Sequence, residues 1–147
     1  MRTDQIRREI ELRAPIEQVW KAITSADELA QWFGDIAAID LRPGGHAKFG
    51  WSEFNGITHA VIDVVEEPTR FAFRWDVMKD TSVEELSTTV EFRLEATDGG
   101  TRLTMVESGF ASLPDDQYED RFKENTSGWD AELVDLVDFL TQESVVG

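Results

Sequence analysis

The sequence predicts an α+β fold in which one antiparallel sheet packs against a long helix at the end of the chain. Three observations support this fold class. Two short helical segments follow a first strand, alternating apolar and polar residues then predict a series of strands, and the last part of the chain has the spacing of an amphipathic helix. A helix pair in that position is expected to close one side of a curved sheet.

The first strand is expected over Ile6–Leu12, and two short helices are expected directly after it. Pro15 suits a first helical turn, where its missing N–H costs nothing. Ser25 and Glu28 match a capping box at the start of the second helix, and Gly34 is placed to end that helix in a left-handed conformation. The apolar positions of the two helices are Ile16, Val19, Trp20, Ile23, Leu29, Trp32 and Phe33.

Further strands are expected between the helix pair and the last helix. They span Ile36–Leu41, Ala47–Trp51, Ile57–Val65, Thr69–Val77, Leu86–Ala96 and Thr101–Gly109. The segments expected to connect them are Arg42–Gly45, Asn55-Gly56, Glu67-Pro68, the polar stretch Lys79–Glu84, and Asp98–Gly100. Alternation is clearest where Phe71, Phe73 and Trp75 share one face of a strand. The predicted sheet is therefore antiparallel.

The last helix is expected to begin near a second capping box, formed by Ser112 and Asp115 with Pro114 in the first turn. Gly128 is expected to loosen or kink the middle of this region. An amphipathic helix of about 14 residues then follows. Its apolar positions are Trp129, Leu133, Leu136, Val137 and Leu140.

Composition limits the function classes. A chain of 147 residues suits a single domain over residues 1–147. It contains no cysteine, so disulfides and thiolate chemistry are excluded. We expect no membrane span, because no apolar run approaches about 18 residues, and no secretory signal, because the N-terminus lacks an apolar segment. A cytoplasmic location is the simplest expectation.

The net charge of −16 makes polyanions poor partners. Nucleic acids and anionic membrane surfaces are bound through clusters of Lys and Arg, and the chain has 14 basic against 30 acidic residues. We therefore expect no nucleic-acid partner. The charge itself is expected to serve solubility.

Several runs resemble one family in their order and spacing. They are APIEQVWKAIT followed by ELAQWFG, RPGG before a strand, FRW at 73–75, GGTRLTMVESGF at 99–110, and GWDAEL at 128–133. Together they resemble the AHSA1-like (activator of Hsp90 ATPase homologue 1-like) branch of the START/Bet v 1-like (SRPBCC) superfamily. The resemblance implies the helix-grip fold, a curved sheet of six or seven strands wrapped on the C-terminal helix. It also implies a ligand cavity between sheet and helix.

The candidate ligand-binding residues are those expected to face this space. They are Trp32, Phe33, Phe49, Trp51, Glu53, Phe71, Phe73, Trp75, Val90, Phe92, Met105, Glu107, Trp129, Leu133 and Leu136. Trp32 and Phe33 are expected at the mouth of the cavity, as a gate. A filled core is the alternative. A dry cavity of about 300 Å³ would cost roughly 7 kcal/mol, so a cavity is expected to be small, wet or occupied.

Polar residues interrupt the inward rows at Glu53, Thr88 and Glu107. Glu107 ends the apolar row of its strand, where loss of water would raise the pKa of its carboxyl unless a partner compensated. It is the candidate catalytic residue, although no nucleophile motif accompanies it. The alternative is that Glu107 reaches the solvated rim or pairs with an arginine.

No metal or cofactor site is expected. His46 and His59 do not have the spacing of metal ligands, and surface or hairpin positions are expected for both. No phosphate-binding or zinc-protease motif occurs, so we expect no cofactor.

Three functions remain open. The first is binding of a hydrophobic or aromatic small molecule between sheet and helix. The second is an interaction module for a chaperone, which the family name suggests and no exposed motif supports. The third is a cyclase-like or hydrolase-like enzyme that uses Glu107, or else Glu53, for proton transfer. The ligand and the choice between monomer and homodimer stay open.

Overall fold

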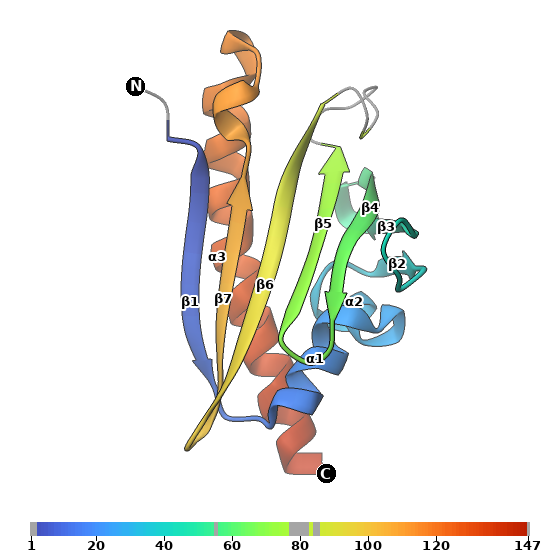
Figure 1. Cartoon of the computed structure of the whole chain (residues 1–147), viewed down its shortest axis with the longest axis vertical. Helices are drawn as coiled ribbons and strands as arrows, with labels where there is room; N and C mark the ends of the chain where they lie inside the picture. The colour runs from blue at the N-terminus through green and yellow to red at the C-terminus, as the bar shows by residue number, and fades with distance from the viewer. Residues whose placement is uncertain (1–2, 55, 77–82, 84–85, 147) are drawn as a thin grey trace.

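The computed structural model describes residues 3–54, 56–76, 83 and 86–146. Its sheet has seven antiparallel strands in the order β1-β7-β6-β5-β4-β3-β2 (Figure 1). The strands are β1 (Gln5–Leu12), β2 (Ile36–Ile39), β3 (His46–Trp51), β4 (Gly56–Glu66), β5 (Arg70–Asp76), β6 (Ser87–Thr97) and β7 (Gly100–Ser108). The helices are α1 (Ile16–Thr24), α2 (Ala26–Trp32) and α3 (Asp115–Val146), with short 3₁₀ turns η1 (Ser52–Phe54) and η2 (Phe110–Ser112). The α+β helix-grip architecture expected from the sequence is confirmed.

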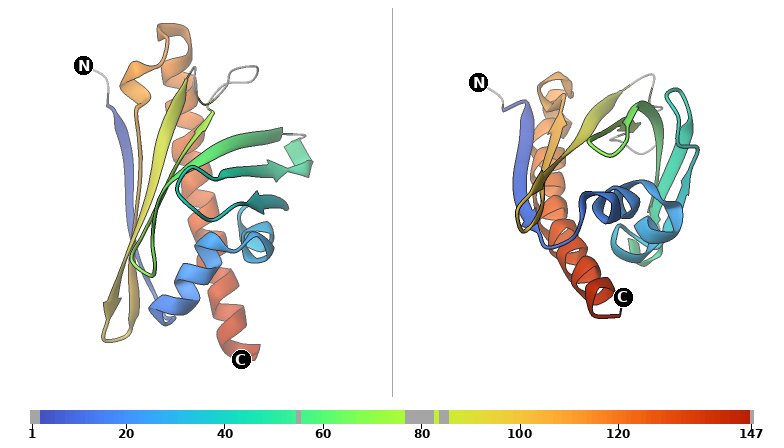
Figure 2. Two further views of the ribbon diagram at one scale, coloured as in Figure 1. Left: turned by 45° about the vertical axis from the view of Figure 1, so that its right-hand side comes forward. Right: turned by 60° about the horizontal axis from the view of Figure 1, so that its bottom comes forward.

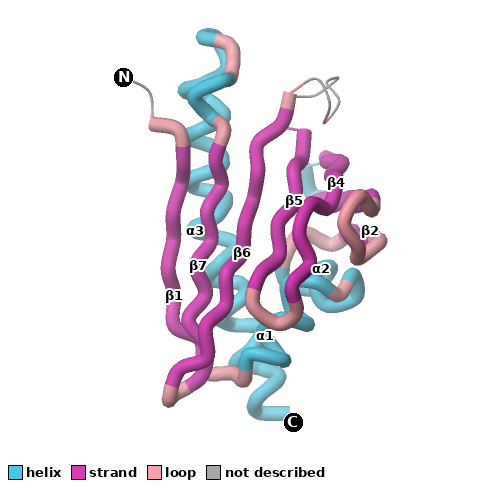
Figure 3. The backbone as a smooth tube through the Cα atoms, in the orientation of Figure 1, coloured by secondary structure: helices cyan, strands magenta, loops and turns pink. Residues whose placement is uncertain are grey.

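The sheet curves around α3, and α1 and α2 lie beside α3 on the same side of the sheet (Figure 2). The tube in Figure 3 shows the long strands β1, β7 and β6 running along α3. Arg8 fastens the edge strand to this helix, since its Nε donates to Asp130 Oδ1 at 2.7 Å. Of the helices that the structure describes, none is long and apolar enough to span a bilayer.

The inward faces of the strands form the core, as their alternation predicts. Phe49, Phe73, Val90, Phe92, Leu103 and Met105 are all buried. Trp20 of α1 packs edge-on against Phe71 of β5, with ring centroids 6.3 Å apart. His46 and His59 are exposed on β3 and β4, as expected.

Both predicted capping boxes are wrong. Ser25 is the N-cap residue of α2, but its side chain makes no capping hydrogen bond. Glu28 is buried and pairs instead with Lys21 of α1 at 3.2 Å. Ser112 belongs to the 3₁₀ turn η2, and α3 starts after Pro114, whose carbonyl accepts the first helical bonds.

α3 is also longer than predicted. It runs unbroken for 32 residues through Gly128, where a kink was expected. The amphipathic spacing predicted from the sequence covers only the second half of the helix. In the first half, Tyr118 and Phe122 also pack against the core, and Arg121, Glu124 and Asn125 line an open pocket that is described below.

Gly34 ends α2 with a positive φ of 74°, as predicted. A Cβ atom at this position would collide with the carbonyl oxygen of Gly50 in β3. Glycine is required here both for its conformation and for this close approach. The contact places the end of α2 directly against β3.

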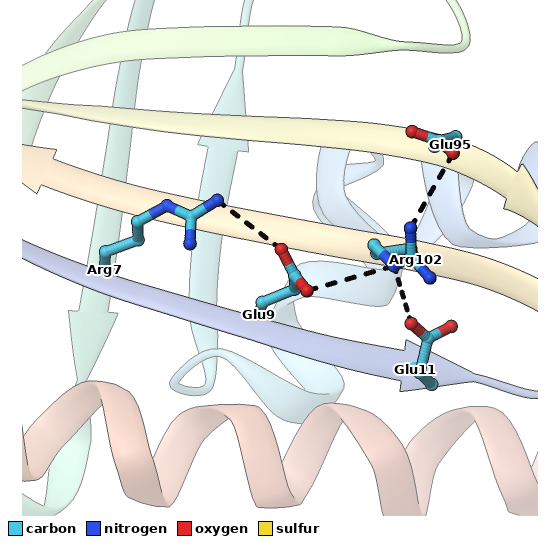
Figure 4. Close-up of polar contacts among 5 residues, drawn as sticks. All are labelled: Arg7, Glu9, Glu11, Glu95 and Arg102. Carbon is cyan, nitrogen blue, oxygen red and sulfur yellow. Dashed lines mark hydrogen bonds and ion pairs between the residues drawn. The ribbon is translucent and has the colours of Figure 1, made fainter.

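Charged side chains pair with one another across β1, β7 and β6 on the outer face of the sheet (Figure 4). Arg102 of β7 lies 2.7 Å from Glu11 and 3.9 Å from Glu9 of β1, and 3.8 Å from Glu95 of β6. Arg7 pairs with Glu9 at 3.4 Å. These exposed ion pairs connect three neighbouring strands.

Candidate functional site

A pocket of about 650 Å³ opens between α3 and the ends of strands β3, β4 and β5. One wall is a single face of α3, because the residues recur at spacings of three and four. It consists of Arg121, Glu124, Asn125, Gly128, Trp129 and Glu132. The opposite wall consists of Phe33, Trp51, Gly56 and Trp75.

Phe33 is the centre of an aromatic cluster beneath the pocket. Its ring centroid lies 5.2 Å from Trp51, 6.0 Å from Trp75 and 5.5 Å from Trp129. Trp75 and Trp129 also contact each other, at 5.9 Å. Rings at these separations attract one another and hold the wall in place. The pocket therefore has a preformed aromatic floor.

The space between the helix pair and the sheet is filled. The void that Ile23, Leu29, Phe49 and Phe71 help to line measures about 10 Å³, no more than a single water needs. The ligand-sized space lies beside the core, along α3, and not in the middle of the fold.

Apart from Glu107, which is described below, the structure separates the predicted site residues into three groups. Phe33, Trp51, Trp75 and Trp129 line the pocket. Phe49, Phe71, Phe73, Val90, Phe92, Met105, Leu133 and Leu136 are packed in the core. Trp32 and Glu53 line a neighbouring groove of about 480 Å³. Contact of any of them with a ligand stays a prediction.

The expected gate residues are both buried. Trp32 turns inward and donates its Nε1–H to the carbonyl of Ala22 at 2.8 Å. Phe33 is buried and lines the pocket. A gating role for the pair stays a prediction that would need movement of α2.

Glu53 does not continue the inward row of β3, and this expectation is wrong. The strand ends at Trp51, and Glu53 lies in the 3₁₀ turn η1 with its side chain exposed. The alternation of a strand does not extend into a helical turn, so it cannot predict which way the side chain of Glu53 points.

Glu107 is fully buried at the end of the inward row of β7. Its oxygens accept hydrogen bonds from Trp75 Nε1 at 2.9 Å, Thr88 Oγ1 at 2.5 Å and Trp129 Nε1 at 2.8 Å. Asn125 Nδ2 lies 3.1 Å from both oxygens. Glu107 thus does not reach the rim, and within the described part of the chain no arginine pairs with it.

These bonds make Glu107 the support of the pocket wall. Trp75, Asn125 and Trp129 all line the pocket, whereas Glu107 lies behind them. One carboxylate therefore sets the orientation of two indoles and one amide, and joins β5, β6 and β7 to α3. All four partners act as donors, which is the arrangement that a carboxylate accepts.

Two carboxyl groups line the pocket, Glu124, which pairs with Arg121, and Glu132. Oε1 of Glu132 accepts a hydrogen bond from Trp51 Nε1 at 3.2 Å. Burial raises the pKa of Glu132 to about 7, the bond from Trp51 opposes that shift, and the nearby charge of Asp135 adds to it. Its Oε2 is buried and has no hydrogen-bond partner among the residues that the structure describes.

Replacing Glu132 with glutamine is expected to remove a pH-dependent loss of stability. Between about pH 4.5 and 7 the unfolded carboxyl is ionised while the folded one keeps its proton, so stability falls as pH rises. Because Glu132 is only partly buried, solvent screening reduces the effect to about 1 kcal/mol. Urea unfolding should show that the free energy of unfolding of the variant exceeds that of the parent by about 1 kcal/mol at pH 8, with no such gain at pH 5. An equal difference at both pH values would contradict the assignment, and the exposed change Glu95→Gln is the matched control.

Sequence reasoning missed much of the α3 wall. Asn125 could be placed on the same helix side as Phe122, but Arg121, Glu124 and Glu132 look like ordinary charged positions. The spacing of Asn125, Gly128, Trp129 and Glu132 at three, four and seven residues was the available signal. It was weak because polar residues on a helix normally face water.

In the described part of the chain, no group of three or more His, Asp or Glu side chains is arranged to hold a metal ion. The pocket contains no cluster of backbone N–H groups or basic side chains for a phosphate, since Arg121 is its one basic lining residue and pairs with Glu124 at 3.1 Å. Its chemistry is that of aromatic surface with carboxyl and amide groups.

Comparison with known proteins identifies relatives. The profile of the family described as "Activator of Hsp90 ATPase homolog 1-like protein" matches residues 13–141. A search of curated proteins found no match.

Solved structures are similar over almost the whole chain. Protein MLL2253 from Mesorhizobium loti has a TM-score of 0.80 at 21% identity, with 94% of this chain and 97% of that chain covered. The Aha1 dimer from Colwellia psychrerythraea has a TM-score of 0.77 at 18% identity, with 94% and 96% covered. DynU16, from the dynemicin biosynthetic locus, has a TM-score of 0.78 at 23% identity, with 95% of this chain and 48% of that chain covered.

Proposed function

The chain belongs to the family of activator of Hsp90 ATPase homolog 1-like proteins, and we propose that it binds a hydrophobic or aromatic small molecule. The binding site is the pocket between α3 and β3–β5. The observation that carries the proposal is the pocket itself, a space of about 650 Å³ with the indoles of Trp51, Trp75 and Trp129 in its wall. Ligand sites are typically concave and largely apolar, with a few well-placed polar groups.

Two polar atoms support the proposal. Arg121 Nε and Glu132 Oε2 are buried without a hydrogen-bond partner in the described part of the chain, and both residues line this pocket. A buried polar group without a partner costs about 1–3 kcal/mol. A molecule in the pocket that supplied an acceptor and a donor would recover that free energy.

The pocket wall is built to keep its shape without a ligand. Glu107 fixes Trp75 and Trp129 by hydrogen bonds from behind, and Phe33 packs against both indoles. A preformed site loses little conformational entropy on binding. An apolar ligand entering it gains roughly 25 cal/mol for each Å² of apolar surface removed from water.

Tryptophan fluorescence tests the proposal. Titration with aromatic compounds and fatty acids is expected to give a saturable change from Trp51, Trp75 and Trp129, which line the pocket. Trp20 is buried in the core, so the variant Trp20→Phe should keep the full response. A panel that produces no saturable change would contradict the proposal.

The other two functions and the oligomeric state stay open. For an enzyme, the candidate proton-transfer group is Glu132, because Glu107 lies behind the pocket wall and Glu124, the other carboxyl group in it, pairs with Arg121. A chaperone partner is suggested only by the family description. The Aha1 relative from Colwellia psychrerythraea is a dimer, and a homodimer of this chain is a proposal on the same footing.

A further inference from the structure

The geometry points to a ligand that carries a positive charge: we propose that the pocket selects an aromatic or alicyclic amine, whose ammonium group binds the carboxylate of Glu132 beside the Trp51 indole. This inference rests on the proposed function, because it specifies the ligand class of the same pocket. Three observations carry it: the state of Glu132, the charges around it, and the neighbouring indole.

Glu132 lacks a compensating charge. Its Oε1 accepts the Trp51 bond at 3.2 Å, and its Oε2 has no partner in the described part of the chain. The final torsion of a glutamate side chain is broad and soft, so a small rotation would bring Oε2 to the pocket. An ionised carboxylate out of water needs a counter-charge, and an ammonium group supplies both that charge and N–H donors.

Acidic residues adjoin Glu132 on the side away from the pocket. The neighbouring groove of about 480 Å³, which shares Trp51 and Glu132 with the pocket, is also lined by Asp35, Glu53 and Asp135 and by no lysine or arginine. An uncompensated negative field attracts a cation and repels an anion.

Arg121 is the one basic side chain in the pocket lining, and it does not neutralise Glu132. Its guanidinium pairs with Glu124 one turn along the helix, at 3.1 Å. Arg121 and Glu132 are also 11 positions apart, which is about 16 Å along a helix. Above the pKa of Glu132, its end of the pocket therefore carries an uncompensated negative charge, while the charge of Arg121 is balanced by Glu124.

The Trp51 indole holds the carboxylate at this end of the pocket. Trp51 Nε1 donates to Oε1 of Glu132 at 3.2 Å, which leaves Oε2 as the acceptor for the ammonium group. The aromatic floor of Phe33, Trp75 and Trp129 then accommodates the apolar body of the same molecule.

Three probes of matched shape test the inference: 1-naphthylmethylamine, 1-naphthalenemethanol and 1-naphthoic acid. They are cationic, neutral and anionic at about pH 8, and their affinities are measured by calorimetry on the intact chain. The amine is expected to bind about tenfold more tightly than the alcohol, and the acid most weakly. Glu132→Gln should lower the affinity for the amine about tenfold and leave that for the alcohol unchanged. Glu95→Gln, on the outer face of the sheet, should change neither.

The outcomes separate the two proposals. If the alcohol binds as tightly as the amine, or if Glu132→Gln keeps the preference for the amine, the charge selectivity is wrong while the binding function stands. If none of the three probes binds saturably, the proposed function fails as well.

Discussion

Replacing Glu107 with alanine is expected to lower the free energy of unfolding by about 4 kcal/mol, a large fraction of the stability of an ordinary domain. The change removes the shared acceptor of Trp75, Thr88, Asn125 and Trp129 and leaves these donors buried or half-buried without it. Each orphaned donor costs about 1–3 kcal/mol, although Trp75 and Thr88 can still bond each other. Urea unfolding followed by circular dichroism measures the effect.

Two further substitutions show whether the loss comes from the network. Glu53→Ala removes a glutamate that is exposed in η1, and should change stability by less than about 0.5 kcal/mol. Glu107→Gln keeps the size of the side chain but turns an NH₂ group toward N–H donors, so we expect an intermediate loss of about 2 kcal/mol. A Glu107→Ala loss no larger than that of Glu53→Ala would overturn the assigned role.

Filling the pocket from Gly128 is expected to abolish ligand binding without unfolding the protein. A Cβ atom at Gly128 meets nothing within 4 Å, and the residue lines the pocket. The ring of Gly128→Phe should therefore occupy the pocket and weaken binding at least about tenfold, or about 1.4 kcal/mol. Calorimetric titration with the tightest probe measures the change.

Gly128→Ala is the matched control for this experiment. Alanine adds one methyl group and favours the helix over glycine by about 0.8–1 kcal/mol, so the variant should be more stable than the parent and should still bind. Undiminished binding by a folded Gly128→Phe variant would exclude this pocket as the binding site.

The sheet could be predicted from the sequence because the alternation of apolar and polar residues can be recognised within each strand alone. Alternation along each strand places Phe73, Phe92 and Met105 inward, and the structure buries all of them. The same alternation places Glu107 inward. Its partners could not be predicted, because Asn125 and Trp129 follow 18 and 22 residues later on a helix whose register against β7 depends on tertiary packing.

The pocket was less predictable than the core for a related reason. An apolar stripe shows where a helix packs, but a helix that borders open space carries polar groups there, and these resemble a solvated surface. In the sequence Glu132 resembles such a solvated residue. The structure shows instead that its Oε1 accepts a hydrogen bond from Trp51 Nε1 at 3.2 Å. The predicted inward orientation of Glu53 is wrong for a local reason, because the 3₁₀ turn η1 directly follows β3. Apolar periodicity therefore predicts where a helix or strand packs against the core. It does not predict where one side of a helix borders an open pocket.

An NMR titration that follows the indole N–H signals of the five tryptophans tests where a ligand binds. On saturation with 1-naphthylmethylamine, the signals of Trp51, Trp75 and Trp129 are predicted to shift, because these side chains line the pocket. Those of Trp20 and Trp32, which line no part of it, should stay in place. Shifts confined to Trp20 or Trp32, or no saturable shift of any indole signal, would contradict a binding site between α3 and strands β3–β5.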